Sequence, residues 1–203
     1  HLKTNLIEGF TMNDKGKKEL IVKKARELFA RYGMKKTTME DIASACGMGK
    51  ATLYYYFKGK EDIFRAVIKE EFEIYRRRME ENISRAKSPH DKIRAFVWTR
   101  SVVLKELANY YETLTAEYLD HYAFVERERQ RLTNWEIDTM QAILEEGVRQ
   151  DLFDISDTRL TAVVLVFALK GLEFPWTVEQ NIIEIERAID LLLPVLFRGI
   201  EKR

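Results

Sequence analysis

Residues 37–64 read TTMEDIASACGMGKATLYYYFKGKEDIF, and this stretch decides the fold. Thr38 precedes the first apolar position and Asp41 follows three residues later, a spacing that caps the start of a helix. Gly47 comes directly after the apolar residues of that helix, where a left-handed glycine ends a helix at little cost. The stretch therefore predicts a short helix, a tight turn and a second short helix.

The second short helix has two distinct faces. Leu53 and Phe57 lie four residues apart, so they share one face and should point into the core. Tyr55 then points almost directly away from the core, with Tyr54 and Tyr56 on either side of it. Tyrosine hydroxyls can donate to phosphates, and the lysines that follow suit a nucleic-acid backbone. This is the layout of a helix-turn-helix, in which one helix braces and the next lies in a DNA groove.

The stretch resembles the tetracycline-repressor (TetR) family of bacterial transcription regulators. The matching segments are TTMEDIA at 37–43, GMGK at 47–50 and LYYYFKGKE at 53–61. The chain departs from the family pattern at Met48 and Gly49, where Ser, Thr or Val is common, and at Tyr56, where His is common. The motif covers about the first quarter of the chain, and the remainder matches in length and helical layout.

The resemblance implies which residues contact DNA. Thr38 and Met39 would lie at the phosphate backbone, the residues from 48 to 52 would approach the bases, the three tyrosines would contact sugar and phosphate, and Lys60 would contact a further phosphate. The implied DNA-binding residues are Thr38, Met39, Met48, Gly49, Lys50, Ala51, Thr52, Tyr54, Tyr55, Tyr56 and Lys60.

Composition is typical of a globular protein with a DNA-binding segment. The chain has 203 residues, of which 46% are hydrophobic, and its net charge is +1. Residues 1–60 hold 13 Lys and Arg against 6 Asp and Glu, a net charge of +7, and residues 61–203 hold 21 against 27, a net charge of −6. A basic segment on an acidic body suits a DNA-binding head on a regulatory body. One cysteine excludes an internal disulfide and fits a cytoplasmic location.

The periodicity predicts an all-α fold with two domains. Residues 1–12 are expected to be an N-terminal extension or a segment added to the native chain. Residues 13–60 should form a three-helix helix-turn-helix domain whose first helix spans about 14–32. Residues 61–203 should form a helical effector-binding and dimerisation domain. Its helices are expected to begin near 61, at Pro89 after Ser88, near 110, near 132, at 157 and near 182, and the helix over 160–172 should break at Pro175.

The last two helices are unusually apolar. The helix near 160–172 is apolar almost all round, and a helix of that kind must be buried on more than one side. The final helix carries a wide apolar stripe and Pro194. We expect the helices over 157–174 and 178–200 to form a homodimer interface; the alternative is a monomeric core. No apolar stretch reaches the roughly 20 residues that a membrane span needs.

No catalytic or metal site is expected. The three histidines are far apart, and His121 with Glu117 is better explained as a surface pair than as a metal site. Neither a phosphate-binding glycine loop nor a nucleophile motif occurs. We therefore expect no enzyme and no cofactor.

A small-molecule site is expected in the C-terminal domain, where aromatic residues gather. Aromatic side chains with a few polar tips suit an apolar effector, although the same residues could simply be core. Arg100 lies on an apolar face, where it could contact a charged ligand, form an internal salt bridge or extend along the surface. The candidate effector-binding residues are Trp98, Arg100, Tyr111, Tyr118, Trp135, Phe167 and Lys170.

These observations predict a homodimeric, ligand-responsive regulator that binds a palindromic double-stranded DNA operator. By the resemblance it would be a repressor, released when an effector shifts the long helix after Lys60 and changes the spacing of the two heads. Half-sites one helical turn apart require a spacing of roughly 34–36 Å. The alternatives are a helical binding or scaffold protein with a non-functional motif, and a helical enzyme with an unrecognised site.

Overall fold

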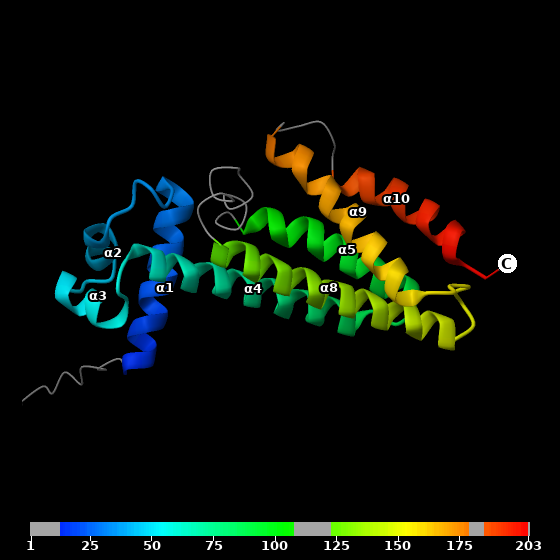
Figure 1. Cartoon of the computed structure of the whole chain (residues 1–203), viewed down its shortest axis with the longest axis horizontal. Coiled ribbons are helices and arrows are strands. Elements are labelled where there is room, and N and C mark those ends of the chain that lie inside the picture. Colours follow the sequence, from blue (N-terminus) through cyan, green and yellow to red (C-terminus); the bar gives the residue numbers. More distant parts are fainter. Residues whose placement is uncertain (1–12, 108–122, 179–184, 203) are drawn as a thin grey trace, which may run out of the picture. The chain divides into compact units, whose positions relative to one another are not determined.

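The computed structural model describes residues 13–107, 123–178 and 185–202, and the regular elements within them are helices and one isolated bridge (Figure 1). The predicted all-α class is confirmed. The chain divides into two compact units, the first ending at Val67 and the second beginning at Ile68. The described helices are α1 (Asp14–Tyr32), α2 (Met39–Ala45), α3 (Lys50–Tyr56), α4 (Lys60–Arg85), α5 (Pro89–Glu106), α8 (Ala123–Arg149), α9 (Thr158–Val178) and α10 (Ile185–Ile200).

The helix ends of the first unit are set by the predicted local signals. α1 stops before Gly33, whose φ of +79° is in the left-handed region. At the start of α2 the Thr38 hydroxyl oxygen accepts from the Asp41 N–H at 3.1 Å, and the Asp41 carboxylate accepts from the Thr38 N–H at 2.8 Å. Gly47, with a φ of +64°, makes the turn that follows α2. The predicted cap and turn are therefore confirmed.

One apolar core holds the helices of the first unit together. The rings of Phe29 and Phe64 meet edge to face with 5.6 Å between their centroids. Burial of such side chains stabilises a fold by roughly 1.5–3 kcal/mol each. The buried apolar residues of this unit are Ile21, Val22, Ala25, Phe29, Met34, Met39, Ile42, Ala43, Leu53, Phe57, Ile63, Phe64 and Val67.

In the second unit α8 packs against both α5 and α9, and α10 packs against α5 (Figure 1). α9 begins at a capped end, since the Asp157 carboxylate accepts from the Leu160 N–H at 2.8 Å. Near the end of α10 the Asp154 N–H donates to the Ile200 carbonyl at 2.9 Å, and Phe153 forms an isolated bridge with Glu201. The end of α10 is thereby fixed to the turn after α8.

The predicted break at Pro175 is wrong. α9 continues through this proline to Val178. A proline inside a helix removes one hydrogen bond at a cost of about 3 kcal/mol, but the remaining turns can keep the helix going. The long helix predicted to begin near residue 61 runs from Lys60 to Arg85. The helix predicted near residues 110–122 lies outside the described residues.

Candidate nucleic-acid interface and effector site

α3 presents one face to the core and the opposite face to solvent. Leu53 and Phe57 are buried, as the helical spacing predicted. Tyr55 is 75% exposed and therefore points away from the core. Tyr54 is exposed and Tyr56 is half-buried. The predicted orientation of α3 is confirmed for these five residues.

The residues predicted to approach the bases surround the start of α3. Gly49, Lys50, Ala51 and Thr52 are exposed, and Met48 is half-buried. No side chain caps this helix, because its first residue is preceded by a glycine. Four N–H groups at the start of any helix lack a partner within the helix, and they carry partial positive charge. The Thr52 N–H donates to the Gly49 carbonyl at 3.0 Å, so the start of α3 presents the N–H groups of Lys50 and Ala51 together with the lysine side chain.

The structure limits how Met39, predicted to lie at the phosphate backbone, could contact DNA. Met39 is only 7% exposed, because it shares the inward face of α2 with Ile42 and Ala43. Its side chain packs in the core, so only its backbone N–H, at the first position of α2, could contact a phosphate. Thr38 is exposed, and its hydroxyl donates to Asp41 at 2.7 Å.

Carboxylates of the first unit hold two further predicted contact residues, Tyr56 and Lys50. The Tyr56 hydroxyl donates to Asp14 Oδ1 at 2.7 Å, and this hydrogen bond raises the pKa of Tyr56 to about 12. Lys50 forms an ion pair with Glu40 of α2, which lowers the pKa of Glu40 and raises that of Lys50. Sequence reasoning missed both acidic partners, which lie 42 and 10 residues away along the chain.

Lys60 and Tyr54, two more of the predicted contact residues, also have partners in the first unit. Lys60 Nζ donates to the carbonyl of Lys35 at 3.3 Å. Lys50 Nζ lies 6.0 Å from the centre of the Tyr54 ring. Both ammonium groups lie near the protein surface, where a phosphate could reach them.

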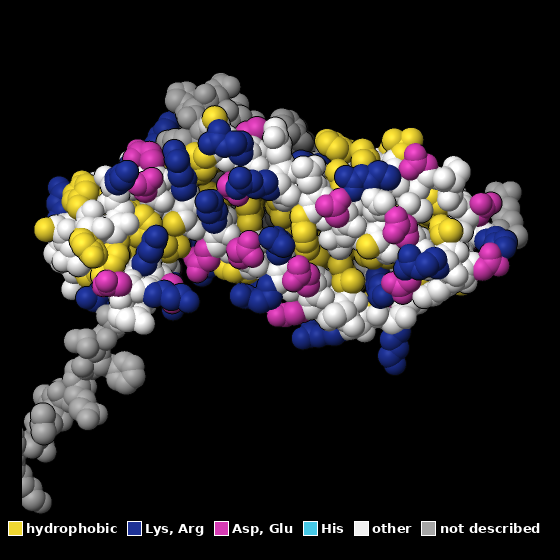
Figure 2. All heavy atoms as spheres, turned by 60° about the horizontal axis from the view of Figure 1, so that its bottom comes forward, with side chains coloured by type: hydrophobic (Ala, Val, Ile, Leu, Met, Phe, Trp, Pro, Cys, Tyr) yellow, Lys and Arg dark blue, Asp and Glu magenta, His cyan; other side chains and the backbone are white. Residues whose placement is uncertain are grey.

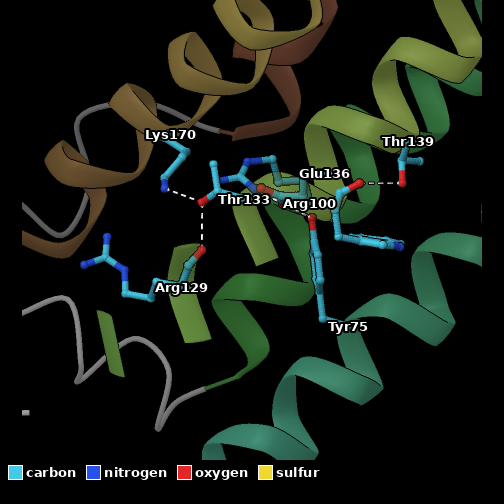
Figure 3. Close-up of polar contacts among 8 residues, drawn as sticks. Tyr75, Arg100, Arg129, Thr133, Glu136, Thr139 and Lys170 are labelled. Atoms are coloured by element: carbon cyan, nitrogen blue, oxygen red, sulfur yellow. Dashed lines mark hydrogen bonds and ion pairs between the residues drawn. The ribbon is translucent and has the colours of Figure 1, made fainter. Parts of the chain in front are cut away.

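The second unit contains a buried polar cluster formed by Tyr75, Arg100 and Glu136. Tyr75 on α4 and Arg100 on α5 both donate to Glu136 Oε1 on α8, and each of the three side chains is buried (Figure 3). Burial raises the pKa of Tyr75 well above its ordinary value, and the negative charge of Glu136 adds to this rise. Of the alternatives for Arg100, the structure therefore gives the internal salt bridge.

Lys170 joins a second chain of polar contacts. Its Nζ donates to the Thr133 hydroxyl oxygen at 2.7 Å, and that hydroxyl donates to the Arg129 carbonyl at 2.8 Å (Figure 3). Lys170 Nζ also lies 5.5 Å from the centre of the Phe167 ring. The hydrogen bond to Thr133 thus holds half-buried Lys170, on α9, against α8.

A surface pocket of about 430 Å³ lies between α4 and α8. The Arg76 guanidinium lies 5.3 Å from the centre of the Trp135 ring in this pocket. Basic, acidic and hydrophobic side chains are interspersed on the face shown in Figure 2. The pocket-lining residues are Lys69, Phe72, Glu73, Arg76, Glu128, Arg131, Leu132 and Trp135.

The predicted effector residues do not converge on this pocket. Among those that the structure describes, Trp135 alone lines it. Trp98 and Phe167 are exposed elsewhere on the second unit. Tyr111 and Tyr118 lie outside the described residues. Sequence reasoning missed Arg76 and Arg131, because charged residues of a helix are normally solvated and neither shows a distinct local signal.

The described residues contain no group of three or more His, Cys, Asp or Glu side chains that could hold a metal ion. In the same part of the chain, no helix combines the length and the apolar character required to cross a membrane.

Comparison with known proteins identifies the helix-turn-helix. The family model for bacterial regulatory proteins of the tetR family matches residues 21–67. The regulator QacR of Staphylococcus aureus (strain Mu50) is 24% identical over 191 residues, which cover 91% of this chain and 98% of QacR. The chain belongs to the TetR family.

Two solved structures of similar fold extend the match over most of this TetR-family chain. A transcriptional regulator from Cytophaga hutchinsonii is 26% identical with a TM-score of 0.76, covering 92% of this chain and 100% of that one. The regulator FadR from Bacillus subtilis, solved in complex with stearoyl-CoA, is 22% identical with a TM-score of 0.71, covering 90% of this chain and 98% of that one.

Membership of the TetR family gives the chain its general function. It is a helix-turn-helix transcriptional regulator, and the family is one of regulators rather than enzymes. The match at residues 21–67 spans α2 and α3, so the recognised motif coincides with the surface that exposes Tyr55.

Proposed function

We propose that this regulator is a repressor that binds a palindromic operator as a homodimer and releases it when a small, largely apolar effector binds. The exposure of Tyr55 carries this proposal. A tyrosine that is 75% exposed, on a helix whose opposite face is buried, supplies a ring and a hydroxyl for a DNA backbone. Such a regulator acts where the chromosome lies, which agrees with the predicted cytoplasmic location.

The proposed DNA contacts lie at three places on the first unit. The backbone N–H of Met39 would meet one phosphate at the start of α2, and the Thr38 hydroxyl could donate to the same phosphate only by releasing Asp41. The start of α3 would enter the major groove, where Lys50 is the strongest donor. The tyrosines of α3 and Lys60 would hold the backbone beside it. Of the residues from 48 to 52, Met48, Gly49 and Ala51 offer no side-chain hydrogen bonds, so DNA shape would carry much of the specificity.

The proposed dimer interface is the apolar surface of α9 and α10. On α9, Leu160, Val164 and Phe167 are each more than half exposed. On α10, Leu191 and Val195 are each 68% exposed. Large apolar side chains spaced three and four residues apart form one stripe on a helix, and stripes of this kind commonly mark protein interfaces. Two heads per dimer would match a palindrome.

The proposed effector contacts begin at Trp135. Its ring and the buried side chains of Phe72 and Leu132 give the pocket between α4 and α8 an apolar floor. FadR of B. subtilis, a relative in fold, was solved with stearoyl-CoA, which supports an effector with a long apolar part. Since α4 begins at Lys60, an effector that moves α4 would also move a proposed DNA contact.

A salt titration of binding to duplex DNA tests this function. The protein should bind a fragment of its own promoter region specifically. The logarithm of its binding constant should fall by about 0.9 per tenfold rise in salt concentration for each phosphate contacted. Mass spectrometry under native conditions would identify a co-purifying effector, and Trp135→Leu should reduce its retention. A helical scaffold with a non-functional motif, the alternative, would bind no fragment in preference to random duplex.

A further inference from the structure

Besides Thr38, whose hydroxyl donates to its capping partner Asp41, two proposed DNA contacts, Tyr56 and Lys50, have anionic partners in the protein without DNA. The Tyr56 hydroxyl donates to Asp14 Oδ1 at 2.7 Å, and Lys50 forms an ion pair with Glu40. The Lys50–Glu40 pair is exposed, with about half of each side chain accessible. A DNA phosphate would therefore meet two donors that carboxylates already occupy.

A carboxylate and a phosphate compete for the same donors. A phenol has one proton, so Tyr56 cannot donate to a phosphate while it donates to Asp14. An ammonium has three protons, so Lys50 can add a phosphate, but Glu40 cancels its charge. Each carboxylate would also repel a phosphate that approaches its partner. The raised pKa of Tyr56 has the Asp14 hydrogen bond as its largest cause, which agrees with this pairing.

We propose that Asp14 and Glu40 limit the affinity for DNA by holding Tyr56 and Lys50 in the place of phosphates. This inference rests on the proposed DNA contacts of Tyr56 and Lys50. The two acidic residues would then oppose DNA binding, and replacing either one with its neutral amide should raise the affinity for DNA.

The presence of acidic residues at positions 14 and 40 also has an ordinary structural explanation. The test must distinguish that explanation from a role in limiting DNA affinity. Both lie in the first turn of a helix, where a negative charge is favourable. Neither is the capping residue, because Asn13 caps α1 and Thr38 caps α2. The amides Asp14→Asn and Glu40→Gln therefore keep both caps, and thermal melting would confirm that each variant stays folded.

Glu27→Gln is the matched control. Glu27 pairs with Lys24 at 2.9 Å on α1, so this variant also removes one exposed charge of the first unit. Neither of these residues is a proposed DNA contact. The probe is a duplex that the unsubstituted protein selects from a random-sequence pool. We expect Asp14→Asn and Glu40→Gln each to tighten binding about two- to fivefold, the range set by a weak exposed pair, and Glu27→Gln to change affinity by much less.

Double variants show whether each carboxylate acts through its partner. The gain from Asp14→Asn should vanish in a Tyr56→Phe background, and that from Glu40→Gln should vanish in a Lys50→Met background, because coupled residues are not additive. Glu40→Gln should also steepen the slope of log binding constant against log salt concentration by up to about 0.9, the contribution of one neutralised phosphate. A purely structural role in a helix turn would produce neither result.

Three results would overturn the inference while leaving the proposed function intact. They are unchanged or weaker binding by both amide variants, an equal gain from Glu27→Gln, and a gain that persists without Tyr56 or Lys50. If the unsubstituted protein selects no duplex from the pool, the proposed function fails, and this inference fails with it.

Discussion

The hydroxyl of Tyr75 on α4 donates a hydrogen bond to the carboxylate of Glu136 on α8. Both side chains are fully buried, and Arg100 of α5 pairs with the same carboxylate oxygen. One buried carboxylate thus joins three helices of the second unit. A buried pair of this kind contributes to stability chiefly through the cost of breaking it.

Replacing Glu136 should therefore lower the free energy of unfolding by more than replacing Tyr75 does. Glu136→Gln removes the charge that offsets Arg100 and should lower the free energy of unfolding by about 3–5 kcal/mol. Tyr75→Phe removes one hydrogen bond to a charged acceptor and should cost about 1.5–3 kcal/mol. Urea unfolding followed by circular dichroism measures both values. A Tyr75→Phe variant less stable than Glu136→Gln would contradict the central place of the carboxylate.

Tyr75 should make the protein less stable in alkali. Its pKa is raised by burial, so above pH 10 the unfolded chain loses this proton while the folded chain keeps it. Stability is complete below the unfolded pKa and falls as pH rises above it, by up to about 1.4 kcal/mol per pH unit. Tyr75→Phe should remove this part of the decline. Unfolding free energies at pH 9, 10 and 11 for both proteins isolate the contribution of Tyr75 from that of the other tyrosines.

Gly147 should tolerate no side chain. A Cβ atom at this position of α8 would lie 2.0 Å from a ring carbon of Phe153. Gly147→Ala should therefore cost about 1–3 kcal/mol, the usual range for overpacking. Combining it with Phe153→Ala should give a smaller loss than the sum of the two single losses, because the ring that clashes is then absent. Additive losses in thermal melting would contradict this explanation.

Charges on the apolar surface of α10 should separate the proposed dimer. Leu191→Glu with Val195→Glu places two unpaired charges in the interface, and burial of unpaired charges is strongly unfavourable. Light scattering should then give the mass of one 24.0 kDa chain. Val148→Glu, at an exposed apolar residue of α8, is the control and should leave a dimer. A monomer already present in the unsubstituted protein at micromolar concentration would refute the dimer itself.

Tyr55→Ala should weaken DNA binding without affecting the fold. The side chain is largely exposed and makes an edge-to-face contact with Tyr56, so little burial is lost. Loss of a backbone contact should reduce affinity roughly tenfold on every DNA sequence, because phosphate and sugar contacts carry no sequence information. Gel-shift titration against specific and random duplexes checks this. Unfolding of Tyr55→Ala would show that Tyr55 is a core residue.

Local signals allowed much of the first unit to be predicted from sequence. Thr38 and Asp41 lie within one turn of helix, and Leu53 and Phe57 lie within another, so caps and faces follow from spacing alone. The stop at Gly33 follows from the conformational freedom of glycine. The resemblance placed Met39 at the phosphate backbone without assigning its side chain, which the structure buries in the core.

Partners that are distant in sequence could not be predicted. An internal salt bridge was one of the expectations for Arg100, but the sequence pattern could not identify Glu136 as the partner, because it lies 36 residues away on another helix. The same holds for Tyr56 and Asp14, which lie at opposite ends of the first three helices of the chain. Periodicity assigns a face to each residue, whereas a partner depends on how the helices pack.

Backbone hydrogen bonds attach the end of α10 to the turn after α8, beside one exposed ion pair between Lys202 and Asp151. Asp154 and Lys202 donate their N–H groups to carbonyls of Ile200 and Leu152, at 2.9 and 3.1 Å. Contacts of this kind do not depend on which side chain a residue carries. An exposed position on these two segments such as Leu152 is therefore free to drift in evolution, while proline is excluded at the two donating positions. This corner of the regulator could change its surface from one species to another without loosening its fold.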